Sequence, residues 1–265
     1  MGLFDKKICA VCGKKKGLFG TKLSDGQYLC GDCTDAFTHF EPLSQIKFNQ
    51  KIQLKDLSLV EYQDQLARRR NNLAELDEFR ATKSFCGFIQ IDEDAQQILF
   101  VEDRVFKNEK KLKEVNPPIF KIENLAFIRM TFQDGDVETT LTGKPMLESK
   151  VFLVMGFEDP IYDVIRVEVG KITSKTGLFG NVKTKTSPDI EALTKTISGM
   201  MDWEISWSAD HDIVTPAADM DAYWRLAKRA KDYGYITGED ITECLRNYYG
   251  KDRIKIREIK KQYKL

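Results

Sequence analysis

Four cysteines in two closely spaced pairs constrain this chain more than any other feature of its sequence. Cys9 and Cys12 form one Cys-x-x-Cys pair, Cys30 and Cys33 form the second, and seventeen residues separate the two pairs. Two residues between sulfurs let a tight turn aim both thiolates at one ion, and a hairpin in the longer gap brings the second pair around it. The spacing predicts a tetrahedral zinc site with four thiolate ligands.

The small size of the segment favours a structural Zn²⁺, one per chain. The few apolar residues between the pairs cannot form a core alone, so the segment needs a metal as a staple. Two disulfides or a redox-active Cys-x-x-Cys are the alternatives. A catalytic zinc would keep an open position, and His39 is the only spare ligand nearby. The ligand charge can be offset by the neighbouring lysines Lys6, Lys7, Lys14, Lys15 and Lys16.

The first 40 residues resemble a known sequence pattern. They begin with MGLFDKKICAVCGKKKGLFGTKLSDGQYLCGDC, in which Leu23, Asp25 and Gly26 form a Leu-x-Asp-Gly turn before the second cysteine pair. This stretch resembles the N-terminal four-cysteine ribbon of an uncharacterised bacterial family, a domain of unknown function. The resemblance implies that the four clustered cysteines are zinc ligands, and it implies no activity.

Composition sets limits on the class of protein. The 265 residues carry 41 basic and 41 acidic side chains, so no bulk charge favours nucleic acid or a membrane surface. The longest apolar run, Val151 to Phe157, is far shorter than a membrane helix requires. Met1 to Lys7 carries charges where a signal peptide would be apolar. We therefore expect a cytoplasmic protein.

Residues 41–83 are expected to form a helical connector after the ribbon. Ser58 and Glu61 form a capping box at the start of a helix that is predicted to run to about Arg80 along one apolar stripe. The basic triple 68–70 could contact phosphate. Acidic residues follow it in the same helix, which favours a solvated face.

Residues 84–207 are predicted to form a β-rich core. Phe85–Ile91 and Gln97–Val101 suggest a hairpin, and five further short strands follow, with a tight turn predicted at Asp134-Gly135. Ser187 and Pro188 then begin a helix with an inner stripe of Ile190, Leu193 and Ile197. Seven strands and a closing helix resemble a pleckstrin-homology-like barrel, which implies a binding scaffold. Lysines 107–113 are expected to lie in a solvated loop.

Beyond a linker at 208–215, residues 216–250 are predicted to form a helical hairpin capped at Thr237. The Gly-x-Ile-Thr turn at 234–237 and the acidic residues after it resemble the short C-terminal domain of many bacterial proteins, which implies oligomerisation or docking. A hairpin this small cannot bury both apolar faces alone. The tail 251–265 holds seven basic and two acidic residues. It could meet nucleic acid, an anionic membrane or an acidic protein, or be a solubilising end.

The sequence offers no recognisable catalytic constellation. Asp210-His211-Asp212 lies in a polar stretch without a nucleophile, Gly143-Lys144 lacks the spacing of a phosphate loop, and Cys86 and Cys244 are expected to be buried hydrophobes. Gly17-Leu-Phe-Gly20 recurs at 177–180, either as unrelated glycine turns or as two tips that dock in a similar groove.

We therefore predict an α+β multi-module protein that is a non-enzymatic zinc-binding adaptor. Its core would bind a protein partner, and residues 216–250 would mediate self-association. Binding of nucleic acid through the ribbon lysines, the basic triple and the tail is the first alternative. Peripheral binding to anionic membrane is the second.

Overall fold

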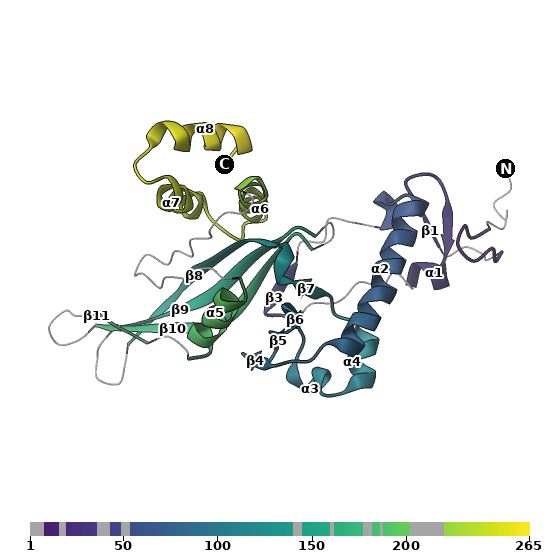
Figure 1. Cartoon of the computed structure of the whole chain (residues 1–265), viewed down its shortest axis with the longest axis horizontal. Coiled ribbons are helices and arrows are strands. Elements are labelled where there is room, and N and C mark those ends of the chain that lie inside the picture. The colour runs from purple at the N-terminus through teal and green to yellow at the C-terminus, as the bar shows by residue number, and fades with distance from the viewer. Residues whose placement is uncertain are drawn as a thin grey trace. The chain divides into compact units, whose positions relative to one another are not determined.

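The computed structural model describes residues 8–15, 20–35, 43–48, 54–139, 145–159, 162–176, 182–185, 188–201 and 220–265. These residues form an α+β protein with several sheets and helices (Figure 1). The chain divides into two compact units. Unit 1 comprises Met1–Glu41, Gln50–Arg80 and Arg104–Ile119, and unit 2 comprises Pro42–Asn49, Ala81–Asp103 and Phe120–Leu265. The ribbon and the long connector helix thus share unit 1, together with residues 104–119 of the predicted core. The rest of the core and the C-terminal helices share unit 2, together with residues 42–49 of the predicted connector.

Unit 1 combines the ribbon with the long helix. Strands β1 (Gly20–Lys22) and β2 (Tyr28–Cys30) form an antiparallel hairpin, and helix α1 (Gly31–Asp35) follows directly. After the short 3-10 helix η1 (Leu54–Asp56), helix α2 (Leu59–Glu78) begins at the predicted capping box. The Ser58 hydroxyl accepts from the Glu61 N–H, and the Glu61 carboxylate accepts from the Ser58 N–H. The predicted start of this helix is confirmed, and its end lies two residues before Arg80.

The far end of α2 packs on a second helical segment, formed by α3 (Asp103–Phe106) and α4 (Glu109–Val115). Asn72 binds both the Asn116 side chain and the Pro117 carbonyl through its amide nitrogen. The prediction of a solvated loop at lysines 107–113 is wrong, because Asn108 caps α4 and most of this segment is helical.

Unit 2 contains a four-stranded antiparallel sheet of β4 (Lys83–Phe85), β5 (Ile89–Asp92), β6 (Gln97–Phe100) and β7 (Ile119–Lys121). The predicted β5–β6 hairpin is confirmed. The prediction of one strand from Phe85 to Ile91 is wrong, because the chain reverses between Phe85 and Ile89. Cys86 and Gly87 both have positive φ, 54° and 74°, and this left-handed pair makes the turn.

The larger sheet has the order β11–β10–β9–β8, and β3 (Ile46–Phe48) also pairs with β10. It contains β8 (Leu125–Thr139), β9 (Pro145–Phe157), β10 (Val164–Thr176) and β11 (Val182–Lys185). The predicted turn at Asp134-Gly135 is wrong. Strand β8 continues through it, and the register shifts between Asp134 and Val137, so a β-bulge takes up the extra residue.

The larger sheet is covered on both faces, which explains the uninterrupted apolar run in β9. On one face Leu153 and Met155 join both sheets and helix α5 (Pro188–Met201) in one hydrophobic cluster. On the other face Val154 joins the C-terminal helices. The predicted inner stripe of α5, Ile190, Leu193 and Ile197, is buried. A strand buried on both faces needs no polar alternation.

Helices α6 (Met220–Asp232) and α7 (Gly238–Tyr249) lie on the second face, and α8 (Arg253–Tyr263) packs on these two helices on the side away from the sheet (Figure 1). The predicted hairpin is confirmed, including the Thr237 cap with its Asp240 capping box. The tail adds a third helix, with Ile256, Ile259 and Tyr263 packed against the same cluster. The tail is therefore not a loose solubilising end.

In the described ranges the strands of the core form two open sheets, so no closed barrel is present there. Several sequence features lie outside the described residues. These are Ser187, the linker 208–215, the triplet 210–212, Gly143-Lys144 and the second Gly-Leu-Phe-Gly at 177–180, together with Trp203 and Trp207, which follow the predicted helix of the core.

Candidate metal centre

Local backbone structure brings the two cysteine pairs together. In the first pair, the Gly13 N–H donates to the Cys9 carbonyl and Gly13 has a φ of 68°, so the chain turns tightly just after Cys12. In the second pair, Cys30 ends β2 and Cys33 lies in α1. The Ala10 N–H donates to the Tyr28 carbonyl, which holds the first turn beside the hairpin.

The four sulfurs have the geometry of a metal site. The sulfurs of Cys9, Cys12, Cys30 and Cys33 all lie within 4.8 Å of one another, and those of Cys12 and Cys30 are 3.7 Å apart. A tetrahedron with zinc–sulfur bonds of about 2.3 Å has sulfur–sulfur edges of about 3.8 Å. All six cysteines of the chain are free thiols, so the disulfide alternative is not what the structure contains. The four sulfurs fit a single Zn²⁺ ion.

The electrostatics of the cluster also favour a cation. Burial opposes ionisation of Cys9, yet backbone N–H groups of Cys12, Cys30 and Val11 outweigh it and lower the pKa of Cys9 to about 6. Burial and the neighbouring thiols raise the pKa of Cys33 well above its ordinary value. One thiolate therefore forms readily, while the full set of four needs a positive ion at its centre.

Two residues that the sequence did not identify as functional hold the cluster against α2. The Tyr62 hydroxyl donates to the Cys33 carbonyl over 2.6 Å, and Tyr62 shares a buried cluster with Cys9 and Cys30. Asp25, predicted only as part of a turn, accepts the Leu59 N–H at the first residue of α2 over 2.8 Å. Both contacts join residues distant in sequence, so spacing could not have identified them. Tyr62 lies at helical spacing between Leu59 and Leu66 on the apolar stripe of this helix, which gave no reason to expect its hydroxyl contact.

The other candidate residues stand apart from this centre. Cys244 is buried as predicted, and burial raises the pKa of the half-buried Cys86 to about 11, so that thiol stays protonated. His39 and His211 lie outside the described residues, as do Lys6, Lys7 and Lys16, while Lys14 and Lys15 are exposed. The basic triple lies on α2, with Arg68 and Arg70 exposed.

The packing of the ribbon explains why residue 20, the last position of the first Gly-Leu-Phe-Gly motif, is a glycine. A Cβ at this position would lie 2.1 Å from the Leu29 carbonyl oxygen, so only glycine fits between β1 and β2. Residues 17–19 lie outside the described part of the chain.

Comparisons with known proteins leave the chain without a matched relative. No family model matches it, and neither a search of curated proteins nor a search of solved structures finds a match. Among the helices in the described ranges, none is long and apolar enough to cross a bilayer.

Proposed function

We propose that the protein is a non-enzymatic, zinc-binding cytoplasmic adaptor whose pleckstrin-homology-like core binds a segment of a partner protein. Four thiolates would fill every position of a tetrahedral ion, which is typical of structural rather than catalytic zinc. When bound, the ion would supply folding energy to the ribbon. The hydrogen bonds of Tyr62 to the Cys33 carbonyl and of the Leu59 N–H to Asp25 would then hold α2 against the folded ribbon.

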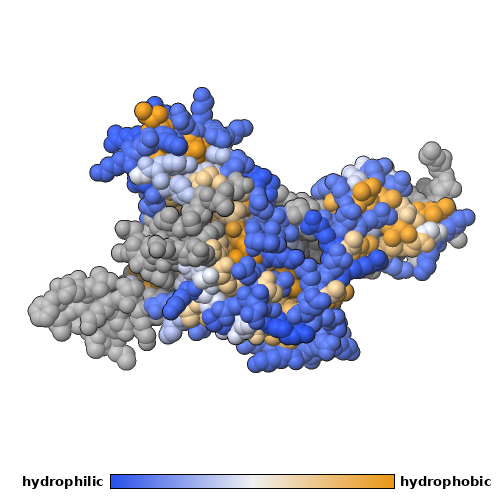
Figure 2. All heavy atoms as spheres, in the orientation of Figure 1, coloured by the Kyte–Doolittle hydropathy of each residue, from blue (hydrophilic) through white to orange (hydrophobic). Residues whose placement is uncertain are grey.

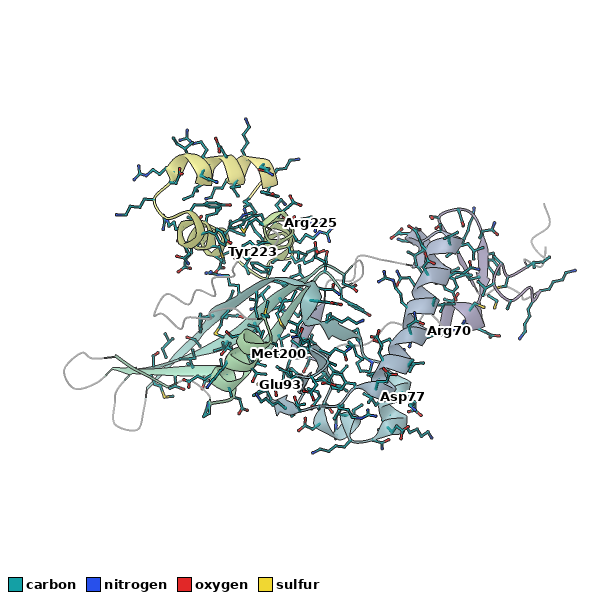
Figure 3. The ribbon with its side chains drawn as sticks, in the orientation of Figure 1. Arg70, Asp77, Glu93, Met200, Tyr223 and Arg225 are labelled. Atoms are coloured by element: carbon teal, nitrogen blue, oxygen red, sulfur yellow. The ribbon has the colours of Figure 1, made fainter. Side chains whose placement is uncertain are left out.

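A groove between β4 and α5 is the observation that carries the binding part of the proposal. The groove has a volume of about 700 Å³, and its lining includes Phe85 and Lys195. Glu93 and Met200, which also line it, are labelled in Figure 3. Among the strands of the described residues β4 pairs only with β5, so its other edge offers a place for a further strand. Binding sites of small domains are concave and combine apolar walls with a few polar groups.

This geometry suits an extended segment of another protein. Such a segment can add to the open edge of β4 through backbone hydrogen bonds, with alternate side chains in the groove. Phe85 and Met200 offer apolar contacts, and the exposed Lys195 offers a cation to an acidic side chain of the partner. We therefore propose an extended segment that alternates apolar and acidic residues.

The order of the core elements supports the proposed resemblance to pleckstrin-homology-like scaffolds. Two antiparallel sheets precede α5, and residues of both sheets share one hydrophobic cluster with that helix. Fold analogy alone does not select a ligand, so the groove and not the resemblance identifies the partner class.

Self-association through residues 216–250 stays a prediction, but the reason first given for it no longer applies. The expectation came from apolar faces that a short hairpin could not bury alone. Helices α6 and α7 bury those faces against Phe127, Val154 and Val164 of the large sheet. Any contact between two copies would therefore use the outer faces of these helices, and sedimentation equilibrium of the full chain tests for it.

A photo-crosslinking amino acid at Lys195 tests the adaptor proposal, with the same group at the exposed Lys107 as the matched control. We expect a discrete adduct with one protein in the source cell only from Lys195. Gly199→Leu should then weaken binding of that purified protein at least tenfold. A Cβ at Gly199 meets nothing within 4 Å, so the variant fills the groove and leaves the fold intact.

Gly238→Leu is the control for the groove-filling variant, since a Cβ there meets only the Lys231 side chain at 4.0 Å. Unchanged affinity of Gly199→Leu would refute the groove. Turnover of a substrate by the purified chain without a partner would refute the non-enzymatic part of the proposal.

A further inference from the structure

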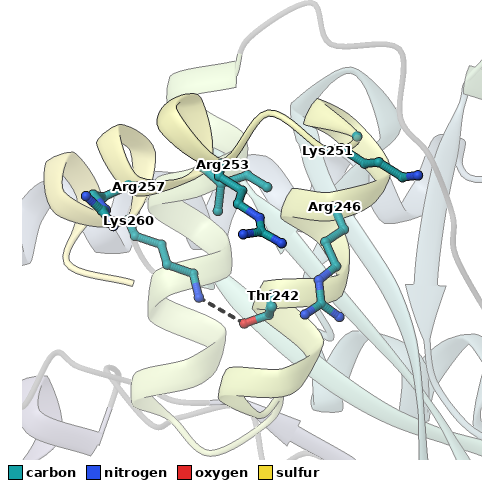
Figure 4. A pocket seen from close by; sticks show the side chains of 8 residues that line it. Thr242, Arg246, Lys251, Arg253, Arg257 and Lys260 are labelled. Atoms are coloured by element: carbon teal, nitrogen blue, oxygen red, sulfur yellow. Dashed lines mark hydrogen bonds between the residues drawn. The ribbon is translucent and has the colours of Figure 1, made fainter.

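The C-terminal helices contain a second groove, between α7 and α8, whose lining is strongly basic (Figure 4). Its volume is about 760 Å³. The cations that line it are Arg246, Lys251, Arg253, Arg257 and Lys260. The remaining lining residues are Thr242, Gly250 and Ile256, so no acidic side chain lines the groove. The whole chain carries equal numbers of basic and acidic residues, which makes this gathering of charge a local feature.

Helical spacing explains how one short helix provides three of these cations. Arg253, Arg257 and Lys260 follow at i, i+4 and i+7 on α8, so they share one face. Lys260 donates to the Thr242 hydroxyl over 3.0 Å, which ties this face to α7 (Figure 4). In the part of the chain that the structure describes, Arg246, Arg253 and Arg257 form no ion pair with an acidic side chain. Three guanidinium groups are therefore available to an external anion.

The chemistry of these side chains favours phosphate. Guanidinium groups bind phosphate oxygens with paired N–H donors, and several of them around one groove suit a ligand that carries more than one negative charge. Such a ligand could be the headgroup layer of a membrane, a free polyphosphate or a nucleic acid strand.

One exposed apolar side chain distinguishes among these sources. Ile254 is 75% exposed, the largest exposed fraction among the large apolar side chains of the described residues. It directly follows Arg253 of the groove, and Arg257 lies one turn further along α8. Figure 2 shows hydrophobic residues among hydrophilic ones on the surface of these helices. Binding of a free anion or of a phosphate backbone would not require a solvent-exposed isoleucine. No aromatic side chain lines the groove to stack on nucleic acid bases.

We propose that the α7–α8 groove and Ile254 together form a docking site for anionic phospholipid at a membrane surface. The cations bind headgroup phosphates, and Ile254 enters the boundary between headgroups and acyl chains. Each basic side chain near an anionic surface contributes about 1 kcal/mol, and a buried apolar side chain adds to this. This site is separate from the β4–α5 groove, so either proposal can fail without the other.

Co-sedimentation of the full chain with vesicles tests the proposal. The probes are vesicles of phosphatidylglycerol in phosphatidylcholine, with vesicles of phosphatidylcholine alone as the reference. The triple variant Arg246→Gln, Arg253→Gln, Arg257→Gln should weaken partitioning about 100-fold. The matched control, Lys107→Gln, Lys110→Gln, Lys111→Gln, removes equal charge from exposed positions and should change it less than threefold. All six positions are exposed, and unchanged thermal unfolding confirms that the variants fold.

Ile254→Gln separates the membrane from a free anion. We expect this variant to lose vesicle binding at least fivefold while its affinity for inorganic tripolyphosphate stays at the wild-type value. The proposal is overturned if both triple variants lose equally, or if Ile254→Gln sediments like the wild type. Binding of tripolyphosphate or single-stranded RNA without any binding of vesicles would also overturn it and identify the other source of phosphate.

Discussion

Arg129 provides the most demanding test of how the C-terminal helices are held to the sheet. Its side chain is only 5% exposed, and it lies on β8 beneath α7. Its Nε and Nη2 atoms donate to one Asp240 oxygen over 3.0 and 2.9 Å, and Nη2 also donates to Glu243. Arg129→Met keeps an unbranched apolar stem like that of arginine and removes all of these interactions.

The expected cost follows from what the variant leaves behind. The Asp240 side chain is 18% exposed, so its carboxylate remains in a poorly solvated position without its guanidinium. Removing one partner of a buried pair costs about 3 to 5 kcal/mol. Asp240 keeps its capping bonds to Thr237, and Glu243 can turn to water, which places the cost at about 3 kcal/mol at the low end of that range. Opening of α7 should become about 100-fold more frequent.

Cys244 reports this opening directly. It is buried, and Arg129 Nη1 donates to its sulfur over 3.3 Å. Labelling with iodoacetamide, followed by peptide mass spectrometry, measures how often α7 exposes this thiol. Arg129→Met should accelerate labelling about 100-fold. Loss of the guanidinium by itself disfavours the thiolate and slows the reaction, so acceleration must come from opening.

Arg225→Met is the matched control (Figure 3), because Arg225 also pairs with a carboxylate, that of Glu158, but its side chain is 51% exposed. An exposed pair is worth less than about 1 kcal/mol, so labelling should accelerate less than about fivefold. Equal labelling rates in the two variants would refute the reasoning. The double variant Arg129→Met, Asp240→Asn should recover part of the loss, since no buried charge remains.

Three further outcomes are expected. Metal analysis should give about one Zn²⁺ per chain. Cys33→Ser should abolish zinc binding and unfold the ribbon, while Cys244 stays protected from iodoacetamide. A fully folded ribbon without metal would contradict the proposed site. Gly156→Ala should cost about 1 to 3 kcal/mol in urea unfolding, because its Cβ would lie 2.9 Å from the Leu226 Cβ; no loss would contradict the packing of α6 on β9. Burial opposes ionisation of Asp240, but its contacts with Thr237 and Arg129 outweigh burial and lower its pKa. Ionised Asp240 therefore stabilises the fold fully above the ordinary pKa of 3.8, and this stabilisation is lost as the pH falls through the lower folded-state pKa. Near-UV circular dichroism should show this transition, and Asp240→Asn should abolish it.

Elements whose signals are local were predictable from the sequence. The capping boxes at Ser58 and Thr237 fix two helix starts, because each cap satisfies N–H groups within one turn of itself. The cysteine spacing predicted the cluster of four sulfurs, because a Cys-x-x-Cys turn and a hairpin are short-range structures.

Two of the wrong predictions concern where the chain turns. Asp134-Gly135 has the composition of a turn, yet its place opposite β9 is set by pairing over a long strand, and a bulge absorbs it. Gly87 is a typical turn residue, but Cys86 adopts a left-handed conformation that a cysteine seldom takes, so the residue types gave only half of the signal for the reversal after Phe85.

By itself, the sequence predicted where α2 and α7 begin, which four sulfurs come together, and an apolar run at Val151–Phe157. Only the tertiary structure decided what covers the second face. The helices that do so begin more than 60 residues later, at Met220, and docking depends on matched shape and charge, as between Gly156 and Leu226 or Arg129 and Asp240. The same docking fixes the α7–α8 groove, because cations distant from each other in sequence converge only once the apolar face of α8 is packed.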